Sequence, residues 1–312
     1  MTTEQKINNI TDFYLSYADQ LYEDPVFRKQ LLTYQFLRRN DSQSDKEYFK
    51  KVLNSHLEEA ALTLSLISDI SFTKKDTLLE IGSGMGLVYG YLKKQGYDIY
   101  GIEPCDSGFD GYFTAAQHLF NIIGVDGSHC YPYVAKETEE LNKKFNLIFS
   151  NNVLEHIPEL EESISSLRKI LKPGGAMVHN TVNYYIPYEP HFKMLLVPFF
   201  PRFTDYFKPS LKTSPLWNGL NFITTTKLKS ICTANNLVIE FRKDRLLKTF
   251  MRLDEDEDFA KRQKYFLPVH KVLKLTGLLK FLDKIPSAMT TPITFTITNA
   301  PVNTESNHCA KE

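Results

Sequence analysis

Short apolar runs alternate with longer segments of helical periodicity through the middle of the chain. Leu78, Leu79 and Ile81 form an apolar run without alternation, as in a strand that is buried on both faces. Apolar residues then recur at helical spacing from Leu87 until Gly96 can end the helix. The alternation predicts strands at 78–81, 99–102, 128–134, 145–150 and 176–180, and helices at 87–95, 113–123 and 158–171. This order favours a parallel sheet with right-handed crossovers, which binds ligands at the carboxyl ends of its strands.

The pattern changes on both sides of this alternating region. Upstream, Ser44 and Glu47 are spaced as a capping box, and one apolar face continues from there to Ile67. Downstream, the alternation lapses after Asn180, resumes with a helix at 225–235 and a strand at 237–241, and ends with an alternating strand at 293–297. We therefore divide the chain into an N-terminal helical cover (1–75), an α/β domain (76–300) with insertions at about 183–223 and 245–290, and a polar tail (301–312).

The loop after the first strand has glycine at alternate positions: Gly82, Gly84 and Gly86. Glycine lets the backbone approach a ligand closely, and the N-terminus of the following helix favours polar or anionic groups. A dinucleotide fingerprint, G-x-G-x-x-G, would need glycine where Leu87 stands. Glu80 would also repel a pyrophosphate, whereas a cationic sulfonium with an amino-acid tail would tolerate this carboxylate. The next strand ends in Glu103, which is placed to accept hydrogen bonds from ribose hydroxyls.

Four blocks follow one another along the chain: Glu80-Ile-Gly-Ser-Gly-Met-Gly86, Gly101-Ile-Glu-Pro104, Phe145-Asn-Leu-Ile-Phe-Ser-Asn-Asn-Val-Leu-Glu-His-Ile157 and Leu167-Arg-Lys-Ile-Leu-Lys-Pro-Gly-Gly175. Their order and spacing resemble the class I S-adenosylmethionine (SAM)-dependent methyltransferases over about residues 76–182. The resemblance implies an α/β fold with a Rossmann-like seven-stranded sheet, whose last strand is antiparallel and which carries acceptor-side insertions. It also implies SAM as the cofactor and methyl transfer as the reaction.

The resemblance assigns donor binding to residues near the ends of the strands. The residues that it implies are Glu80, Gly82, Ser83, Gly84, Gly86, Glu103, Asn151 and Asn152. The glycines approach the methionine part of SAM, and Glu80 shapes their loop. Glu103 accepts the ribose hydroxyls. The two asparagines directly follow the fourth strand, lie under the donor and line the path to the acceptor.

Three residues are candidates for catalysis at the acceptor. His156 follows the fourth strand, and in the resembling family this histidine either faces the acceptor or braces the loop, so both roles remain open. Glu189 and His191 follow the fifth strand in a segment whose prolines predict an ordered loop. This Tyr-x-x-x-Glu-Pro-His segment resembles one in bacterial methyltransferases that act on surface glycans or related metabolites. The alternative interpretation of this segment is a structural loop with a buried salt bridge or a capping histidine.

Composition narrows the class of partners. The 37 basic and 37 acidic residues give a formal net charge of zero, which leaves no electrostatic case for nucleic acid. The four cysteines are scattered without a C-x-x-C pair, so we expect free thiols in a reducing cytoplasm and no metal site. The start of the chain is polar and no apolar run is long enough for a membrane span, which favours a cytoplasmic protein.

The sequence leaves several acceptors open. The main hypothesis is methyl transfer to an oxygen, or a nitrogen, of a small molecule or glycan. The alternatives are a quinone precursor, a lipid-linked acceptor, and a protein that binds SAM without catalysis; Leu87 disfavours an NAD-dependent dehydrogenase. An apolar stripe runs from Val269 to Leu282, with lysines elsewhere on the surface. This pattern is compatible with a helix that lies on a membrane surface. It is more typical of a helix that packs on its own protein.

Overall fold

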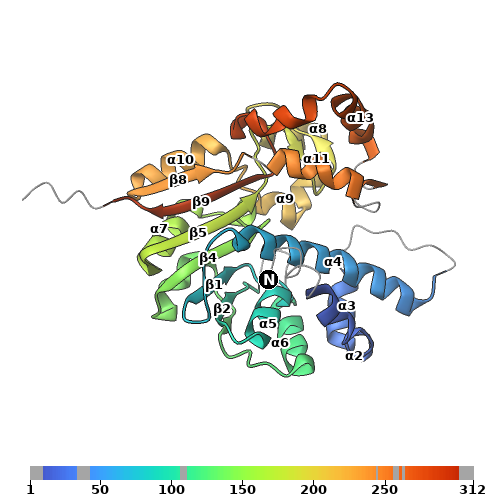
Figure 1. Cartoon of the computed structure of the whole chain (residues 1–312), viewed down its shortest axis with the longest axis vertical. Helices are drawn as coiled ribbons and strands as arrows, with labels where there is room; N and C mark the ends of the chain where they lie inside the picture. The colour runs from blue at the N-terminus through green and yellow to red at the C-terminus, as the bar shows by residue number, and fades with distance from the viewer. Residues whose placement is uncertain are drawn as a thin grey trace, which may run out of the picture.

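A seven-stranded sheet in the order β3-β2-β1-β4-β5-β9-β8 forms the centre of the fold (Figure 1). The computed structural model describes residues 10–33, 43–105, 111–243, 245–255, 260–261 and 264–301. The strands are β1 Thr77–Ile81, β2 Asp98–Ile102, β3 Cys130–Tyr131, β4 Phe145–Asn151, β5 Leu171–Thr181, β8 Leu237–Phe241 and β9 Ile293–Asn299. The first five strands pair in parallel, and β9 runs antiparallel to both of its neighbours. The predicted Rossmann-like sheet with an antiparallel last strand is therefore confirmed.

Each face of the sheet is buried by its own set of helices. Successive β1 residues point to opposite faces, so Leu78 belongs to one core and Leu79 to the other. The first core lies under α2 Ala18–Glu23, α3 Pro25–Thr33, α4 Asp45–Ser68, α5 Leu87–Lys94 and α6 Tyr112–Ile123. The second lies under α7 Leu160–Ile170 and α10 Thr225–Ala234. This double burial explains why the β1 sequence is apolar without alternation.

The N-terminal cover is helical, as its sequence predicts. Helix α4 begins with the expected capping box, in which Ser44 accepts from the Glu47 backbone and the Glu47 carboxylate accepts from Ser44 N at 2.9 Å. Its apolar face is buried from Phe49 to Ile67. Farther upstream, the Tyr14 hydroxyl donates to Leu87 O at 2.6 Å, which fixes the cover against the start of α5.

The two insertions consist of short helices, turns and one small hairpin. The first contains β6 Tyr188–Glu189, β7 Met194–Leu195, η3 Pro201–Phe203, α8 Thr204–Phe207, η4 Pro209–Thr213 and α9 Pro215–Gly219. The second contains α11 Arg245–Glu255, η5 Lys264–Phe266, α13 Leu267–Leu275, η6 Leu278–Lys284 and η7 Ser287–Met289. Figure 1 shows α8, α11 and α13 at the end of the molecule away from α5 and α6. None of the described helices combines the length and apolarity that a bilayer crossing requires.

Several boundaries differ from the expected ones for physical reasons. The strand expected at 128–134 is only β3, which stops before Pro132 because proline has no N–H for the ladder. Strand β5 begins at Leu171, before the expected start at 176, and residues 172–175 form an irregularity within it, where the register shifts between Phe145 and Leu147. Asp254 and Glu255, the first two residues of an acidic run that continues to position 258 in the sequence, end α11. The rest of that run and residues 302–312 of the tail lie outside the described residues.

Candidate active site

A cavity lies at the carboxyl ends of β1 and β4, where a parallel sheet of this kind binds ligands. Its volume is about 280 Å³. The residues that line it come from α4, from the glycine loop with the start of α5, from α6 and from the end of β4: His56, Glu59, Ala60, Thr63, Glu80, Gly82, Ser83, Gly84, Met85, Leu87, Val88, Tyr112, Asn151 and Asn152. The structure thus brings together six of the eight residues predicted to bind the donor.

The three glycines of the loop have different roles in the packing. All three have positive φ, at 66° for Gly82, 55° for Gly84 and 77° for Gly86. A Cβ on Gly82 would lie 2.5 Å from a methyl of Val153, and one on Gly86 would lie 2.5 Å from the ring of Phe120. A Cβ on Gly84 would meet nothing within 4 Å. Gly86 is not part of the cavity lining and caps α5, whereas Gly84 leaves open space beside the cavity.

Two carboxyl groups, those of Glu80 and Glu103, lie at this end of the cavity. Burial raises the pKa of Glu80 well above its ordinary value, and the nearby charge of Glu103 raises it further, against a hydrogen bond from the Tyr89 backbone. Within the described chain, Oε2 of Glu80 is buried and has no hydrogen-bond partner. Glu103 does not line the cavity itself, but its Oε2 accepts from Gly84 N at 2.7 Å. A ligand with positive charge or polar hydrogens would satisfy Glu80.

A network of amide side chains fixes the cavity wall formed by the end of β4. Asn180 donates from Nδ2 to Asn151 Oδ1 at 2.9 Å and to Asn152 Oδ1 at 3.4 Å. Asn151 in turn donates to the Thr63 hydroxyl of α4 at 3.1 Å. Thr294 of β9 donates to Asn180 Oδ1 at 2.8 Å. The network ties the cover helix to three neighbouring strands and orients both asparagines.

Helix α4 supplies lining residues that the sequence reasoning did not single out. His56, Glu59 and Thr63 are polar positions spaced along one helix that is otherwise apolar where it meets the sheet. That spacing was the available signal, because positions three and four apart share one helix face. Burial lowers the pKa of His56 to about 4, so its imidazole is neutral at pH 7.

A second cluster of polar side chains lies after β5, in the first insertion. Nδ1 of His191 lies 2.6 Å from Oε1 of the fully buried Glu189. Glu189 also accepts from the Tyr184 hydroxyl at 3.1 Å and from Phe192 N at 2.7 Å. The ring of His156 lies 5.0 Å from that of His191, between centroids. All three predicted catalytic residues therefore lie in one cluster.

The electrostatics of this cluster distinguish its two histidines. Burial lowers the pKa of His191, but the hydrogen bond from its ring to Glu189 and the charges of Glu189 and Glu155 outweigh burial and raise it above its ordinary value. Burial together with the charge of His191 lowers the pKa of His156 to about 4. His156 is thus a neutral ring at pH 7. His191 is the more basic imidazole, and a carboxylate orients its ring.

The loop after β4 connects this cluster to the cavity. Asn152 lines the cavity, and Val153 packs against Gly82 of the glycine loop. Four residues after Asn152, His156 ends the short helix η2 Leu154–His156. Asn221 of the first insertion donates from Nδ2 to Leu154 O at 2.6 Å and to Ile157 O at 2.8 Å. One loop therefore contacts the glycine turn on one side and the insertion on the other.

Residues 53–240 match the methyltransferase-domain family, a stretch that includes the glycine loop, the end of β4 and the His191 cluster. The chain belongs to this family. It is a SAM-dependent methyltransferase with the class I fold, which confirms the predicted family, reaction and cofactor.

Sequence relatives of the methyltransferase are similar over part of their length. An uncharacterized protein of Mycobacterium tuberculosis is 30% identical over 199 residues, which cover 60% of this chain and 66% of that protein. A ubiquinone biosynthesis O-methyltransferase of Paramagnetospirillum magneticum is 32% identical over 108 residues, 34% of this chain and 41% of that enzyme. The matches thus span less than two thirds of the length of these relatives.

Solved structures similar to the methyltransferase are distant in sequence. Phosphoethanolamine N-methyltransferase 2 of Haemonchus contortus, in complex with S-adenosyl-L-methionine, is 15% identical; the match covers 77% of this chain and 52% of that one, with a TM-score of 0.47. The CcbJ methyltransferase of Streptomyces caelestis is 12% identical; the match covers 78% and 94% of the two chains, with a TM-score of 0.44.

The cavity of the methyltransferase suits SAM in charge and in shape. Oε2 of Glu80, for which the described residues offer no hydrogen-bond partner, matches a ligand that carries a sulfonium and an ammonium group. The open space at Gly84 leaves room for a ligand against the backbone. Among the residues described, no three His, Cys, Asp or Glu side chains are grouped to hold a metal ion.

Proposed function

We propose that this methyltransferase moves the methyl group of SAM to an oxygen, or a nitrogen, of a small-molecule or glycan acceptor, with His191 as the general base. The observation that carries this proposal is the 2.6 Å contact between His191 Nδ1 and Glu189 Oε1. Glu189 is held in turn by Tyr184 and the Phe192 amide, so the imidazole has a fixed orientation. None of the described residues is hydrogen-bonded to the other ring nitrogen, Nε2.

Each residue of the cluster has its own role in removing the proton of the acceptor. Bound SAM supplies a methyl group that its sulfonium already activates. The Nε2 lone pair of His191 accepts the proton of the acceptor hydroxyl or amine as the new bond forms, and such general-base catalysis contributes about 10²–10⁴-fold. Glu189 keeps the Nδ1 proton in place and stabilises the imidazolium that results. His156, as a neutral neighbour, braces the loop on which it lies.

The cavity residues hold and orient the donor in this proposal. Glu80 lies against its positive charge, and Gly82, Ser83 and Gly84 let its amino-acid tail approach the loop. Glu103 receives the ribose hydroxyls in place of part of its present contacts. Asn151 and Asn152, oriented by Asn180, form the wall between donor and acceptor. Alignment of this kind in principle supplies much of the rate enhancement of a methyl transfer.

Quinone precursors are a second candidate class of acceptor. The partial match to ubiquinone biosynthesis O-methyltransferases supports oxygen as the atom that is methylated and a phenol as the acceptor. A phenolic hydroxyl needs a base of modest strength, which an imidazole with a raised pKa provides. A protein that binds SAM without catalysis would have no use for an oriented base.

Turnover with methyl-labelled SAM tests the base directly. The acceptor panel consists of catechols, simple phenols and hexoses, and the variants are His191→Gln, Glu189→Gln and His156→Gln. We expect His191→Gln to lower kcat by about 10²-fold or more with the SAM dissociation constant unchanged, because the proton is removed only as the bond forms. The wild-type rate should rise with pH through the pKa of His191, which lies above the ordinary value of a histidine.

His118→Gln is a matched control, because His118 also pairs with a carboxylate, that of Asp24 at 2.9 Å, but does so between α6 and the N-terminal cover. It should keep full turnover. Near-wild-type turnover of His191→Gln across pH 6 to 9 would show that His191 is not the base. Tight SAM binding without turnover on any acceptor would favour a binding protein instead.

A further inference from the structure

The first insertion presents an unusual row of exposed aromatic side chains. Their exposed fractions are 90% for Phe199, 63% for Phe200, 64% for Phe203, 74% for Tyr206 and 76% for Phe207. Single exposed apolar residues are common on proteins, but five exposed aromatic rings within nine residues are typical of a surface that contacts a membrane, a ligand or another protein. We refer to these five side chains as the aromatic surface.

Internal contacts hold the backbone of this segment in place. Arg202 donates to Trp217 O at 2.7 Å and to Leu220 O at 2.6 Å, and its guanidinium lies 4.8 Å from the centre of the Phe222 ring. Val197 N donates to the Thr204 hydroxyl at 2.9 Å. The one arginine of the segment thus bonds to the backbone of residues 217–220 and anchors the segment, while the neighbouring rings point to solvent. The rings are exposed because of how the segment packs, and the segment itself is not loose.

The second insertion exposes another apolar surface. The exposed fractions are 50% for Val269, 58% for Val272, 87% for Leu275, 49% for Leu278 and 44% for Phe281, and we call this set the second apolar surface. We expected the apolar stripe from Val269 to Leu282 to pack on its own protein, and only part of the stripe does so. Leu282 is buried, whereas Val269 and Val272 face solvent. The reason is that α13 contacts mainly its own insertion, through η5, η6 and α11.

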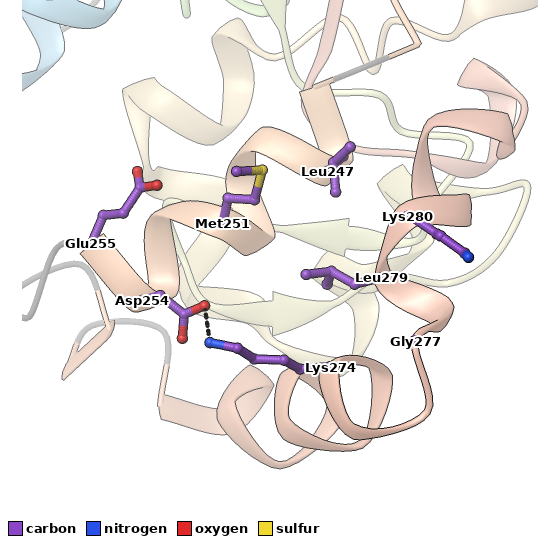
Figure 2. A pocket seen from close by; sticks show the side chains of 8 residues that line it. All are labelled: Leu247, Met251, Asp254, Glu255, Lys274, Gly277, Leu279 and Lys280. Carbon is purple, nitrogen blue, oxygen red and sulfur yellow. Dashed lines mark hydrogen bonds and ion pairs between the residues drawn. The ribbon is translucent and has the colours of Figure 1, made fainter.

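A hollow lies beside the second apolar surface. A cavity of about 470 Å³ lies between α11 and η6, with Leu247, Met251 and Leu279 on its wall (Figure 2). Lys274 and Lys280 also line it, and Lys274 is paired with Asp254 at 2.7 Å. The hollow shares no lining residue with the cavity at the glycine loop. An insertion with an apolar hollow and an apolar exterior is suited to contact with hydrocarbon.

Basic residues accompany both surfaces in a chain whose net charge is zero. In residues 199–212, Lys208 and Lys212 accompany Asp205, while Arg202 is occupied by backbone carbonyls. Residues 267–284 contain four lysines and one aspartate, and one of these lysines, Lys274, is paired with Asp254 of α11. Lys280 and Lys284 lie 5.3 and 5.0 Å from the centre of the Phe281 ring, so charge and aromatic face are adjacent. Aromatic rings interleaved with lysines are typical of protein surfaces that lie in the headgroup region of a membrane.

We propose that the aromatic surface and the second apolar surface dock this methyltransferase on an anionic lipid membrane. The rings and aliphatic side chains enter the boundary between headgroups and acyl chains, and the lysines lie against the anionic headgroups. A second copy of the chain fits less well, because an identical face would bring like-charged lysines together. Docking concerns these insertions alone and does not depend on which residue is the base.

The aromatic surface lies close in sequence to the proposed acceptor site. Phe199 follows β7 by four residues, and β7 pairs with β6, which carries Glu189. Leu196 N donates to Pro187 O at 2.9 Å, so the chain leaves the hairpin directly toward the rings. A docked enzyme would therefore hold the hairpin with His191 near the lipid surface. An acceptor carried on a lipid would be within reach there, and this last step rests on the proposed function.

Sedimentation with lipid vesicles tests the docking without donor or acceptor. The probes are vesicles of phosphatidylcholine alone and of phosphatidylcholine mixed with phosphatidylglycerol. We expect the wild-type chain to bind the anionic vesicles at low salt, with affinity reduced about tenfold or more on neutral vesicles or in about 0.5 M NaCl. The triple variant Phe199→Ser, Phe203→Ser, Phe207→Ser should lose about tenfold or more in affinity, because it lacks three rings that would be buried in the membrane. Val272→Ser with Leu275→Ser should also weaken binding.

Val238→Ser is the control, since Val238 is 39% exposed on β8, far along the chain from both surfaces. It should bind vesicles as the wild type does, and all variants should keep the wild-type melting temperature. No binding to anionic vesicles, or equal binding by all variants, would overturn the proposal. A dimer that the triple variant dissociates, without any vesicle binding, would overturn it in favour of self-association. Turnover on water-dissolved acceptors in the same preparations keeps a failure of docking distinct from a failure of catalysis.

Discussion

At the scale of single residues, Glu80 is the proposed donor-binding group whose surroundings make the most specific prediction. It is buried beside Glu103, its Oε2 has no partner within the described chain, and burial raises its pKa. A carboxyl in this situation binds a proton in the free protein more readily than in water. The positive charge of SAM favours the ionised form, so donor binding should release this proton.

We therefore predict that SAM affinity rises with pH up to the pKa of Glu80 in the free protein and levels off above it. Calorimetry in two buffers with different ionisation enthalpies should show protons released on binding below that pKa. Glu80→Gln should abolish the release and weaken binding by about 1.5–3 kcal/mol, the range for a hydrogen bond to a charged group. Equal heats in both buffers, together with an affinity that does not change with pH, would contradict this assignment.

The sequence was sufficient to locate some residues of the candidate site and not others. The glycine loop and the asparagines after β4 lie at the cavity, where the strand order placed them, because that location depends on position along the chain. Their roles in donor binding stay predictions. His156 and His191 were equally good candidates, since sequence does not show which imidazole meets a carboxylate. The hydrogen bond between His191 and Glu189 depends on how the turn after β6 folds. That fold depends in turn on contacts with Tyr184 and the rest of the insertion.

At the scale of elements, the glycine loop gives a matched pair of substitutions. Both Gly82→Ala and Gly84→Ala place a side chain at positive φ, which costs about 1–2 kcal/mol. Gly82→Ala also meets Val153 at 2.5 Å, so we expect it to lower the free energy of unfolding by about 2–4 kcal/mol in all. Gly84→Ala meets no atom within 4 Å and should lose less stability but more SAM affinity. Urea unfolding and calorimetry on both variants measure the two quantities, and equal losses of stability would count against the distinction.

Elements were predicted well where their patterns were local and less well where tertiary contacts decided them. Helix α4 follows from its capping box and apolar face, and the structure has it at Asp45–Ser68. Its contribution to the cavity wall depends on Asn151 reaching Thr63, a contact between residues far apart in the chain. Strand β3 is shorter than expected because the chain reaches Pro132 after two paired residues. Strand β5 is longer because its first residue, Leu171, pairs with Phe145 across an irregular register.

At the scale of the whole molecule, the two insertions depart most from what sequence patterns predict. The alternating core buries apolar runs on both faces of one sheet, so its layout follows from the sequence order of strands and helices. The insertions contain only short elements, and an apolar stripe in them does not reveal whether it packs inward. Leu282 is buried and Leu275 is 87% exposed, although both belong to the same insertion and have the same side chain. Exposure of this kind is decided by the packing of the complete insertion.

Several buried imidazoles link the stability of the whole fold to pH. Burial lowers the pKa of His56 to about 4 and that of His179 to about 3, and burial with the charge of His191 lowers the pKa of His156 to about 4. In the unfolded chain these rings have a pKa near 6.5, so the unfolded state binds more protons between these values. Their stabilising effect is complete above pH 6.5 and is lost as the pH falls toward 4.

The variant His179→Gln isolates this effect, because the raised pKa values of Glu80, Glu155 and His191 act in the opposite sense in the wild type and variant alike. His179 is fully buried and lies 2.7 Å from the Ser150 hydroxyl, so the variant should be less stable at pH 8. Its disadvantage should shrink by about 2–3 kcal/mol between pH 6.5 and 4.5, since each pH unit within that window is worth about 1.4 kcal/mol. Urea unfolding at half-unit pH steps measures the difference, with His118→Gln as a partly exposed control. A difference between wild type and His179→Gln that stays constant over this range would show that His179 does not resist protonation in the folded state.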